Sequence, residues 1–546
     1  VDLHVGLRPG TEDLYVGSTS PGRIYKDLII LGTRVSEGNP SAPGDIRAFN
    51  VRTGELRWSF HTIPHPGEFG YNTWPGDAWQ RAGGANCWAG MSLDAERGVV
   101  YVPTGSAAFD FYGADRHGDN LFANCVLALD AATGKRLWHY QIVRHDVWDR
   151  DLPAPPNLVT VVHDGRRIDA VAQITKSAHV FLFDRDTGEP LFPIEERAVP
   201  ASDLPGERLS PTQPIPLKPP AFGRQILTED ELTDISPEAR ASVVEQFRAA
   251  RSTGQFEPPS EQGTVIFPGF DGGGEWGGAA FDPETGLLYV NGNEMAWILT
   301  MVDKTKRQGQ SLGETVYRDN CMLCHGPQGK GNEVGMPPVT GLEKMRTRDE
   351  VREVTAKGKG FMPAFDFLND AELEAVVELL FNPEALAAVT VADTATDAQD
   401  DRPRAYTHTG YNRFFDAEGY PAIKPPWGVL AAIDLNKGET AWQIPLGEFE
   451  ELTKRGIPPT GTENYGGPCV TKGGLIFIAA TQDEKFRAFD KRTGELLWQA
   501  DLPAGGYATP STYMVDGRQF VVIAAGGGKM GTKSGDAYVA FALPEE

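Results

Sequence analysis

One short phrase recurs five times along the chain, and it limits the possible fold more than any other feature of the sequence. In each copy an Asp or Asn is followed four residues later by Gly and eight residues later by an aromatic residue. The sets are Asn50/Gly54/Trp58, Asp130/Gly134/Trp138, Asp184/Gly188/Phe192, Asp434/Gly438/Trp442 and Asp490/Gly494/Trp498. The pattern is typical of a strand, a tight turn in which Asp or Asn bonds its own backbone and Gly adopts a positive φ, and a second strand.

Further short β segments, such as GVVYVPTG and GLIFIAAT, lie between the copies. Units of about four strands that repeat about every 50 residues are typical of a β-propeller, in which the aromatic residue packs against the neighbouring unit. A set of unrelated hairpins with the same turn chemistry is the alternative, but the constant spacing argues against it. The content of 62 Gly and 41 Pro also suits a turn-rich all-β fold.

Two interruptions divide the repeats. Residues 195–262 are Pro-rich and then helical (SPEARASVVEQFRAA), which predicts a long loop over one face. Residues 304–404 end in the polar tract VADTATDAQDDRPRA, which is typical of a linker. The expected domains are therefore a first part of the propeller at 1–303, an inserted domain with its linker at 304–404, and a last part of the propeller at 405–546.

A Cys-x-x-Cys-His cluster formed by Cys321, Cys324 and His325 lies in the second interruption. This is the motif of covalent haem c attachment, in which two thiols add to the porphyrin vinyl groups and the adjacent His binds the iron. A zinc site would need two more Cys or His nearby, and residues 304–404 contain no others. The cluster therefore predicts haem c.

Two methionines could supply the second axial ligand of the haem. Met362, in GKGFMPAF, is the predicted ligand, and Met336, in VGMPPV, is the alternative. Helix N-caps are expected at Ser311 and at Asn369. The segment resembles a small class I cytochrome c domain, which is all-α. Because haem c is attached outside the cytoplasm, the resemblance implies a periplasmic or extracellular protein.

The repeats and several longer stretches resemble the pyrroloquinoline quinone (PQQ) dehydrogenases, and most closely their glucose dehydrogenase branch. Those stretches include HDVWDRDLPAPPNLV, GEWGGAAFDPETGLLYVNGNE and PPSEQGTVIFPG. The resemblance covers nearly all of the chain outside the cytochrome-like segment and implies an eight-bladed type of propeller. About six blades can be counted in this chain, and its opening, VDLHVGLRPG, resembles a point inside the family sequence. We therefore expect an open ring that lacks two N-terminal blades and binds PQQ poorly.

Three residues match cofactor and catalytic positions of that family. Trp88, in NCWAGMSLD, matches the tryptophan beneath the quinone, and Asp149, in HDVWDRD, matches the carboxylate that acts as general base and metal ligand. Asp146 and Asp151 are the alternatives for this carboxylate. Lys176 lies 27 residues beyond Asp149 and matches the lysine that hydrogen-bonds the quinone oxygens.

Two further matches concern the cofactor and its metal. Asn293, in VNGNE, matches an Asn that bonds the cofactor, with Asn291 as the alternative, and Glu37, in TRVSEGN, falls where the family has a metal-binding acid. Ser106 stands where the alcohol branch has a metal-ligating Asn, which puts an alcohol-type coordination set in doubt. Calcium still suits a hard-oxygen site formed by carboxylates and the quinone.

The resemblance implies oxidation of a sugar, polyol or other alcohol by hydride transfer to PQQ, with electrons leaving singly through the haem. The expected partners are the substrate and a downstream electron acceptor, either a cytochrome or a quinone of the respiratory chain. A non-catalytic propeller scaffold and an electron-transfer cytochrome without bound PQQ are the alternatives. The net charge of −24 argues against nucleic acid, and no apolar run of about 18 residues is present to form a transmembrane segment.

Three cysteines lie outside the haem motif. Cys87 and Cys125 could form a disulfide in an oxidising compartment, but the sequence does not give their separation, so the pairing stays open. Cys469 is expected to be a buried lone thiol.

Overall fold

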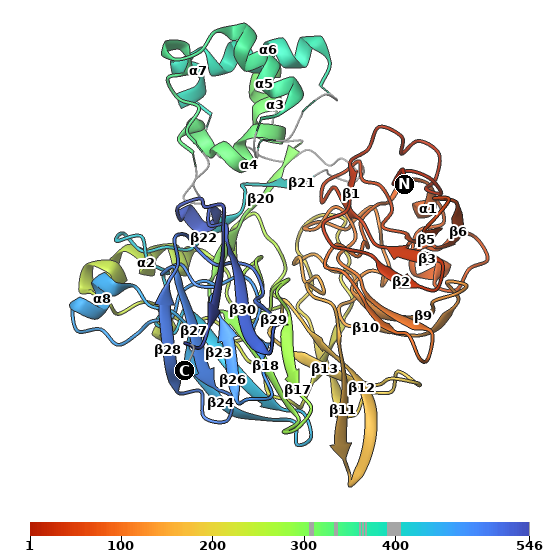
Figure 1. Cartoon of the computed structure of the whole chain (residues 1–546). Coiled ribbons are helices and arrows are strands. Elements are labelled where there is room, and N and C mark those ends of the chain that lie inside the picture. Colours follow the sequence, from red (N-terminus) through yellow and green to blue (C-terminus); the bar gives the residue numbers. More distant parts are fainter. Residues whose placement is uncertain are drawn as a thin grey trace.

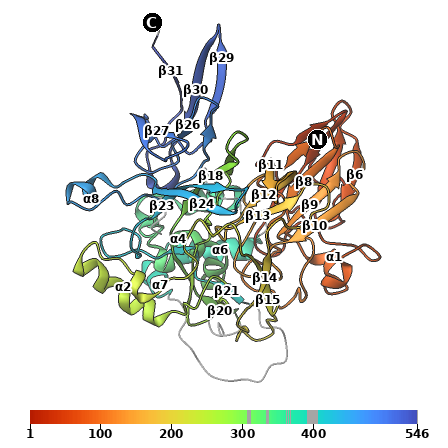
Figure 2. The ribbon, with the colours of Figure 1, turned by 90° about the horizontal axis from the view of Figure 1, so that it is seen from below.

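The structure is a computed structural model, and it describes residues 1–304, 311–331, 337–359, 362, 365, 368–389 and 406–544. Antiparallel sheets follow one another around an arc, and a helical domain stands at one side of it (Figure 1). Seen from below, the arc runs from the N-terminal sheets to the C-terminal sheets (Figure 2). The predicted β-propeller fold with a small inserted helical domain is confirmed.

The first three sheets of the arc precede the first interruption of the repeats. They pair in the orders β2–β3–β5–β6, β7–β8–β9–β10 and β11–β12–β13. Their strands are β2 (Arg23–Tyr25), β3 (Leu28–Leu31), β5 (Ile46–Asn50), β6 (Leu56–Phe60), β7 (Ser92–Asp94), β8 (Val99–Pro103), β9 (Cys125–Asp130), β10 (Arg136–Gln141), β11 (Asn157–His163), β12 (Arg166–Ile174) and β13 (Val180–Asp184).

The next three sheets pair in the orders β17–β18–β23–β24, β25–β26–β27–β28 and β29–β30–β31. The fourth sheet of the arc joins strands from both sides of the helical insert, so the insert interrupts a blade without disrupting it. The strands are β17 (Ala279–Asp282), β18 (Leu287–Asn293), β23 (Gly428–Asp434), β24 (Glu439–Pro445), β25 (Cys469–Val470), β26 (Leu475–Ile478), β27 (Lys485–Asp490), β28 (Leu496–Asp501), β29 (Ser511–Val515), β30 (Arg518–Ala525) and β31 (Ala537–Ala542).

Smaller sheets lie in the connections between the blades. They pair as β1–β4, β14–β15, β16–β19–β22 and β20–β21. Their strands are β1 (Val16–Gly17), β4 (Arg34–Val35), β14 (Ile194–Ala198), β15 (Thr212–Pro216), β16 (Thr264–Ile266), β19 (Trp297–Leu299), β20 (Met301–Asp303), β21 (Tyr406–His408) and β22 (Asn412–Arg413). Three helices also lie outside the insert: α1 (Ala78–Arg81), α2 (Pro237–Ala249) and α8 (Glu450–Lys454).

The recurrent phrase forms the turn that its sequence predicts. In the third copy, Asp184 Oδ1 accepts a hydrogen bond of 3.0 Å from the backbone N–H of Asp186, and Gly188 has a φ of +75°. A Cβ at Gly188 would lie 2.6 Å from the ring of Trp138 in the preceding copy, so the bare glycine lets the ring approach the turn. Trp138 Nε1 donates to the carbonyl of Arg185 at 3.1 Å. The same contact joins Gly134 to Trp58, Gly438 to Phe192 and Gly494 to Trp442.

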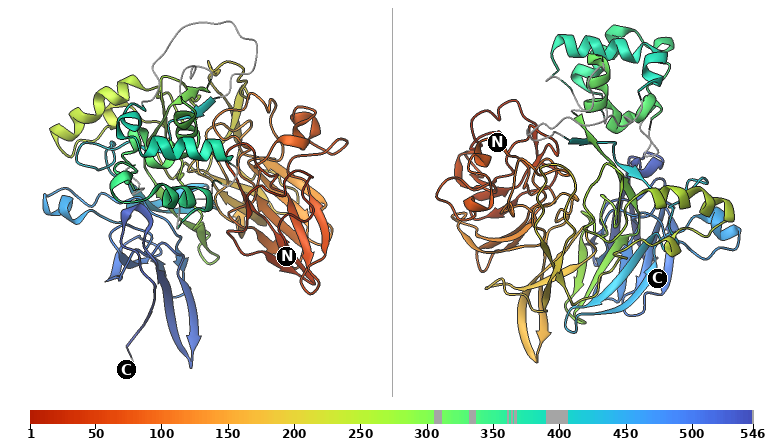
Figure 3. Two further views of the ribbon diagram at one scale, coloured as in Figure 1. Left: turned by 90° about the horizontal axis from the view of Figure 1, so that it is seen from above. Right: turned by 180° about the vertical axis from the view of Figure 1, so that it is seen from behind.

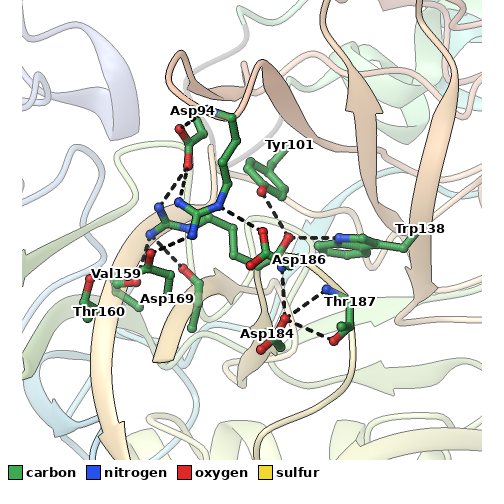
Figure 4. A network of polar contacts seen from close by, with 12 residues as sticks. Asp94, Tyr101, Trp138, Val159, Thr160, Asp169, Asp184, Asp186 and Thr187 are labelled. Carbon is green, nitrogen blue, oxygen red and sulfur yellow. Dashed lines mark hydrogen bonds and ion pairs between the residues drawn. The ribbon is translucent and has the colours of Figure 1, made fainter. Parts of the chain in front are cut away.

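Charged side chains add a second link between the second and third blades (Figure 4). Arg97 lies 3.1 Å from Asp94, 2.7 Å from Asp169 and 2.9 Å from Asp186, measured between nitrogen and oxygen. Arg185 also contacts Asp94, at 3.1 Å. Networks of this kind hold geometry better than isolated surface pairs do, because each charge has more than one partner.

No further copy of the phrase follows the last one, so no glycine turn covers its aromatic residue, Trp498. Trp498 is 39% exposed, whereas Trp58 and Trp138 are 8% and 7% exposed. Among the strands of the described residues, none of the first blade pairs with a strand of the sixth. Backbone hydrogen bonds therefore do not close the ring in this part of the chain.

The first interruption folds against the propeller. It forms the hairpin β14–β15 and the helix α2, whose N-cap Ser236 accepts a hydrogen bond of 3.0 Å from the backbone N–H of Ala239. Val243 of α2 packs in the same buried cluster as Trp427.

The second interruption contains the helical insert. Its helices are α3 (Leu312–Val316), α4 (Met322–His325), α5 (Arg348–Lys357), α6 (Asp370–Leu380) and α7 (Pro383–Ala387). The predicted N-caps Ser311 and Asn369 are confirmed, and each forms a capping box. The paired strands β20 and β21 form the stalk of the insert (Figure 3). No helix in the described ranges has the length and apolar character that a bilayer span requires.

Candidate active site

A cavity of about 630 Å³ lies among the loops of several blades. Four residues predicted for the site line it: Glu37, Trp88, Asp149 and Lys176. They come from separate loops, after β4, before β7, before β11 and after β12. The arrangement therefore brings together residues that are far apart in the sequence, and its volume suits a small organic ligand.

Asp149 and Lys176 form a buried ion pair in this cavity. Lys176 Nζ lies 2.8 Å from Asp149 Oδ1 and 3.9 Å from Asp151 Oδ2. Burial raises the pKa of Asp149 well above its usual value, Lys176 opposes the shift, and the carboxylates of Asp151 and Glu37 add to it. Burial alone would lower the pKa of Lys176, but Asp149 and Asp151 more than offset it, so the pKa is raised and the side chain stays charged. A buried carboxylate of raised pKa in a cavity suits proton transfer.

Asp151 holds the ring of Trp88. Trp88 Nε1 donates to Asp151 Oδ2 at 2.7 Å. The other oxygen, Oδ1, accepts a hydrogen bond of 2.5 Å from the backbone N–H of Ser106 and lies 2.8 Å from Ser106 Oγ. Both oxygens of Asp151 are therefore engaged in positioning its neighbours, and the hydroxyl of Ser106 is taken up by carboxylates.

Asp146, another alternative for the catalytic carboxylate, does not line the cavity. Its Oδ2 lies 2.6 Å from Ser106 Oγ and 2.8 Å from Asn124 Nδ2, and its Oδ1 accepts a hydrogen bond of 2.8 Å from the backbone N–H of Trp148. Asp149, in contrast, has Lys176 as its one hydrogen-bond donor among the described residues. Of the three carboxylates, Asp149 therefore has the fewest hydrogen bonds to the described residues.

The cavity is also lined by two side chains that sequence patterns do not single out, Tyr411 and Asp110. Tyr411 Oη donates to Glu37 Oε2 at 3.0 Å, and Asp110 is 4% exposed. Burial raises the pKa of Asp110 well above its usual value, and the carboxylates of Asp149 and Glu37 raise it further. The available signal for Asp110 is its position soon after the strand end PTGSAA, because loops that follow strands often carry functional residues.

Acidic side chains outnumber basic ones around the cavity. The acidic side chains are Glu37, Asp110, Asp149, Asp151, Asp271 and Glu275, and the basic ones are Arg34, Lys176 and Lys529. This excess of hard oxygen donors suits a divalent cation such as calcium. Within the described ranges, however, no three His, Cys, Asp or Glu side chains converge closely enough to hold a metal ion by themselves. Further ligands would have to be oxygens of another kind, such as amide or backbone carbonyl oxygens, or come from a bound molecule.

Asn293 and Asn291 lie on β18 and not on the wall of the cavity. Asn293 Nδ2 donates to the carbonyl of Asn464 at 3.1 Å, and its Oδ1 accepts 2.7 Å from the backbone N–H of Asn464. Asn291 Nδ2 donates to Asn464 Oδ1 at 2.6 Å and to the carbonyl of Gly466 at 2.9 Å. Both amides therefore join the fourth blade to the segment before the fifth, and a cofactor contact for Asn293 stays a prediction.

The haem motif lies at the start of the insert. Cys321 is the N-cap of α4, and Cys324 and His325 lie on that helix. His325 Nδ1 lies 2.9 Å from the carbonyl oxygen of Pro337. Because a carbonyl only accepts, Nδ1 carries a hydrogen, and in the neutral ring Nε2 then has the lone pair that an iron ligand needs. Met362 is half-buried and forms an isolated bridge with Lys359, and Met336 lies outside the described residues.

The other cysteines are free thiols. Cys87 and Cys125 are buried but not bonded to each other. Cys87 Sγ donates to the carbonyl of Gly90 at 3.3 Å, and burial raises its pKa to about 12. Cys469 is half-buried and not fully buried, and it lies on the short edge strand β25.

Comparisons with known proteins give matches over both parts of the chain. Residues 1–337 and 364–521 match the family described as PQQ, glucose/ethanol/alcohol dehydrogenase, β-propeller domain. Residues 309–380 match the family described as cytochrome c oxidase, cbb3-type, subunit III. The first match spans the propeller, the second lies within the helical insert, and the two overlap at residues 309–337 and 364–380.

Individual relatives cover nearly all of the chain. It is 32% identical over 555 residues to the quinate/shikimate dehydrogenase (quinone) of Acinetobacter baylyi, covering 100% of this chain and 59% of that protein. It is 31% identical over 551 residues to the quinoprotein glucose dehydrogenase of Escherichia coli, covering 98% and 59%. The quinohemoprotein alcohol dehydrogenase of Comamonas testosteroni shares the fold, with a TM-score of 0.56 at 21% identity, covering 99% of this chain and 63% of that one. The chain thus spans about 59% of the length of the two curated relatives.

Proposed function

The chain belongs to the glucose/ethanol/alcohol dehydrogenase family of PQQ β-propellers, and on that premise we propose that it oxidises a CH–OH group of a sugar, polyol or other alcohol. The reaction takes place in the cavity that contains Asp149 and Lys176. Electrons leave through a haem c in the helical insert to a cytochrome or a quinone of the respiratory chain. The observation that carries the proposal is the buried Asp149–Lys176 pair beside Trp88.

The residues around the cavity fit PQQ, which is flat, aromatic and anionic. Trp88 offers an aromatic face that Asp151 holds in place, and Arg34, Lys176 and Lys529 offer positive charge. When bound, PQQ supplies a two-electron acceptor for the hydride of the substrate. The lysine and the tryptophan would hold and orient it.

Asp149 is the proposed general base. Its raised pKa lets it take the proton from the hydroxyl of the substrate. Lys176, at 2.8 Å, holds the carboxylate in one orientation and opposes its premature protonation. Burial of both groups keeps water from competing for the proton.

Calcium is the proposed metal, with Glu37 and Asp149 as its protein ligands. Both are hard oxygen donors on the wall of one cavity. Tyr411 holds one oxygen of Glu37, which leaves the other oxygen for a cation. The hydroxyl of Ser106 is engaged by Asp146 and Asp151, so it would contribute little to the coordination.

The thiols of Cys321 and Cys324 would hold a haem c, and His325 and Met362 are the residues proposed to ligate its iron. The hydrogen bond from His325 Nδ1 to Pro337 supports this, because it orients Nε2 as a ligand. Covalent attachment of haem c occurs outside the cytoplasm, so we propose a periplasmic or extracellular location.

Reconstitution tests the proposal against a non-catalytic scaffold and against a cytochrome without PQQ. Purified protein is incubated with Ca²⁺ and with an excess of PQQ, because an open ring is expected to bind PQQ poorly, and dye reduction is measured with sugars, polyols and primary alcohols. We expect turnover that Asp149→Asn lowers by about 10²–10⁴-fold with PQQ still bound. Asp164→Asn, at the exposed tip of the β11–β12 hairpin, is the matched control. Absence of turnover with every substrate, or full activity in Asp149→Asn, would contradict the proposal.

The haem is tested separately. Denatured protein is expected to stay positive in a haem stain, and Cys321→Ser is expected to weaken the attachment. A haem that leaves on denaturation would contradict covalent binding without affecting the proposal for the cavity.

A further inference from the structure

Asp110 is a carboxylate for which the described protein supplies no partner. It is 4% exposed, it lines the cavity, and no hydrogen bond or ion pair engages its side chain within the described residues. The neighbouring Asp149 and Asp151 both have donors. A buried carboxylate without a donor is costly, and native proteins satisfy such groups with a ligand, an ion or water.

An aromatic wall lies beside Asp110. Phe270, Trp297 and Tyr411 line the same cavity, and Phe111, the residue next to Asp110, contacts Phe270 with ring centroids 5.0 Å apart. The centroid of Phe270 lies 5.4 Å from that of Trp297 and 5.3 Å from that of Tyr411. The cavity thus offers both hydrogen-bond acceptors and a set of aromatic rings in contact with one another.

These two surfaces match the two kinds of surface on a cyclic polyol. The C–H groups of such a ring form an apolar face that packs on aromatic side chains, and its hydroxyls project around the edge as hydrogen-bond donors. Two carboxylates that face one cavity, Asp149 and Asp110, can accept from two hydroxyls of one molecule. A monohydric alcohol could satisfy one of them and would leave the other unpaired.

We propose that Asp110 determines specificity by accepting a hydrogen bond from a second hydroxyl of the substrate while Asp149 takes the proton from the reacting hydroxyl. The substrate class is then a polyol with at least two hydroxyls on neighbouring carbons, preferably on a ring. This inference rests on the proposed function and narrows it. A site built to bond a hydroxyl discriminates strongly against an analogue without one, because its buried polar group is then left unpaired.

Two probes that differ by one hydroxyl test the role of Asp110: cyclohexane-1,2-diol and cyclohexanol. The full chain loaded with PQQ and Ca²⁺ is expected to prefer the diol in kcat/KM. In Asp110→Ala this preference is expected to fall at least about tenfold, through KM for the diol, with little change for cyclohexanol. Asp115→Ala is the matched control, since it removes a carboxylate from the same loop at an exposed position. It is expected to keep the preference.

A binding measurement on the PQQ-free protein separates failure of this inference from failure of the proposed function. The diol is expected to raise the Tm of the wild-type protein and not that of Asp110→Ala, and cyclohexanol is expected to raise neither. A diol-specific shift without turnover would overturn the proposed function and support the role of Asp110. If Asp110→Ala lowered kcat/KM equally for both probes and also weakened Ca²⁺ binding, Asp110 would be a cation ligand, and the inference would be overturned. If Asp110→Ala kept both the preference for the diol in kcat/KM and the rise in Tm with the diol, the inference would be overturned as well.

Discussion

The second and fifth units of the propeller carry the same recurrent phrase with different results. In the second unit Trp138 is 7% exposed, packs against Gly188 of the following copy and donates to the carbonyl of Arg185. In the fifth unit Trp498 is 39% exposed and contacts Phe486 and Phe541 instead, with ring centroids 6.1 and 5.1 Å apart. The phrase specifies the local hairpin in both places, whereas burial of its aromatic residue depends on the unit that follows.

The last two sheets of the arc show the same difference on a larger scale. Leu496 and Leu497 of β28 and Tyr513, Met514 and Val515 of β29 are all exposed. Interior blades bury the corresponding faces in shared hydrophobic clusters. A group of exposed apolar residues of this kind marks a contact surface or a site of aggregation. Stability in this molecule is therefore a property of neighbouring blades and not of a blade by itself.

Removing an interior aromatic residue is expected to have the largest effect. Trp138→Ala deletes a buried ring between two blades and removes one of the two donors to the carbonyl of Arg185, the other being Tyr101 Oη. We expect a loss of about 3–5 kcal/mol in the free energy of unfolding, measured by urea denaturation. If Trp138→Ala lost no more unfolding free energy than Trp498→Ala, the comparison between the two units would fail, because burial of the ring would then not explain its contribution to stability.

A methyl group at the interior glycine turn is expected to have the next largest effect. Gly188→Ala adds strain at a φ of +75° and places a Cβ 2.6 Å from the ring of Trp138, and together these are expected to cost about 2–4 kcal/mol. Gly54→Ala is the matched control, because its φ is +72° but the nearest atom to its Cβ would be a methyl of Val1 at 3.8 Å. It is expected to cost about 1–2 kcal/mol. Equal losses would show that backbone strain, and not the ring contact, makes glycine necessary.

Acidification is expected to loosen an interior blade by a smaller amount. Burial, with help from Arg136, lowers the pKa of His139 in β10 to about 4 from 6.5. The folded state thus binds fewer protons than the unfolded state, and stability is lost as pH falls from about 6.5 toward 4. We expect the free energy of unfolding to fall by about 1–2 kcal/mol over this range, after allowance for partial exposure of the ring. His139→Gln should remove this part of the pH dependence, and an unchanged profile would contradict the assignment. The last sheet, residues 511–542, contains no His, so hydrogen exchange there should not show the same change.

Removing the aromatic side chain of Trp498, near the end of the arc, is expected to have the smallest effect on stability. Trp498→Ala removes a partly exposed ring, so we expect a loss of about 1 kcal/mol or less. The same substitution reduces the exposed apolar surface, and light scattering should show less aggregation. A loss comparable to that of Trp138→Ala would mean that another surface covers Trp498 in solution.

The sequence predicts the elements that depend on local chemistry. The repeat spacing is enough for the hairpins, and the positions of Ser311 and Asn369 are enough for two helix caps. The matches at Trp88 and Asp149 point to residues that the structure brings to one cavity. These residues follow strands or turns whose pattern can be recognised one segment at a time.

The rest of the site depends on which loops meet. Asp110 and Tyr411 have no distinctive neighbours in the sequence, and their roles arise from contacts with residues such as Glu37, 374 positions away from Tyr411. Asn293 shows the reverse case, because its bonds to Asn464 could not be foreseen from either segment alone. Interactions across blades are set by packing, which a single sequence does not display.

The stalk of the helical insert has a consequence for how such a chain can be modified. Asp303 at the end of β20 pairs with Tyr406 at the start of β21, and paired antiparallel residues lie about 5 Å apart. A short hairpin turn could therefore join these two positions without moving either strand. The insert can therefore be exchanged as a unit, and another small domain could be grafted at the same pair of residues.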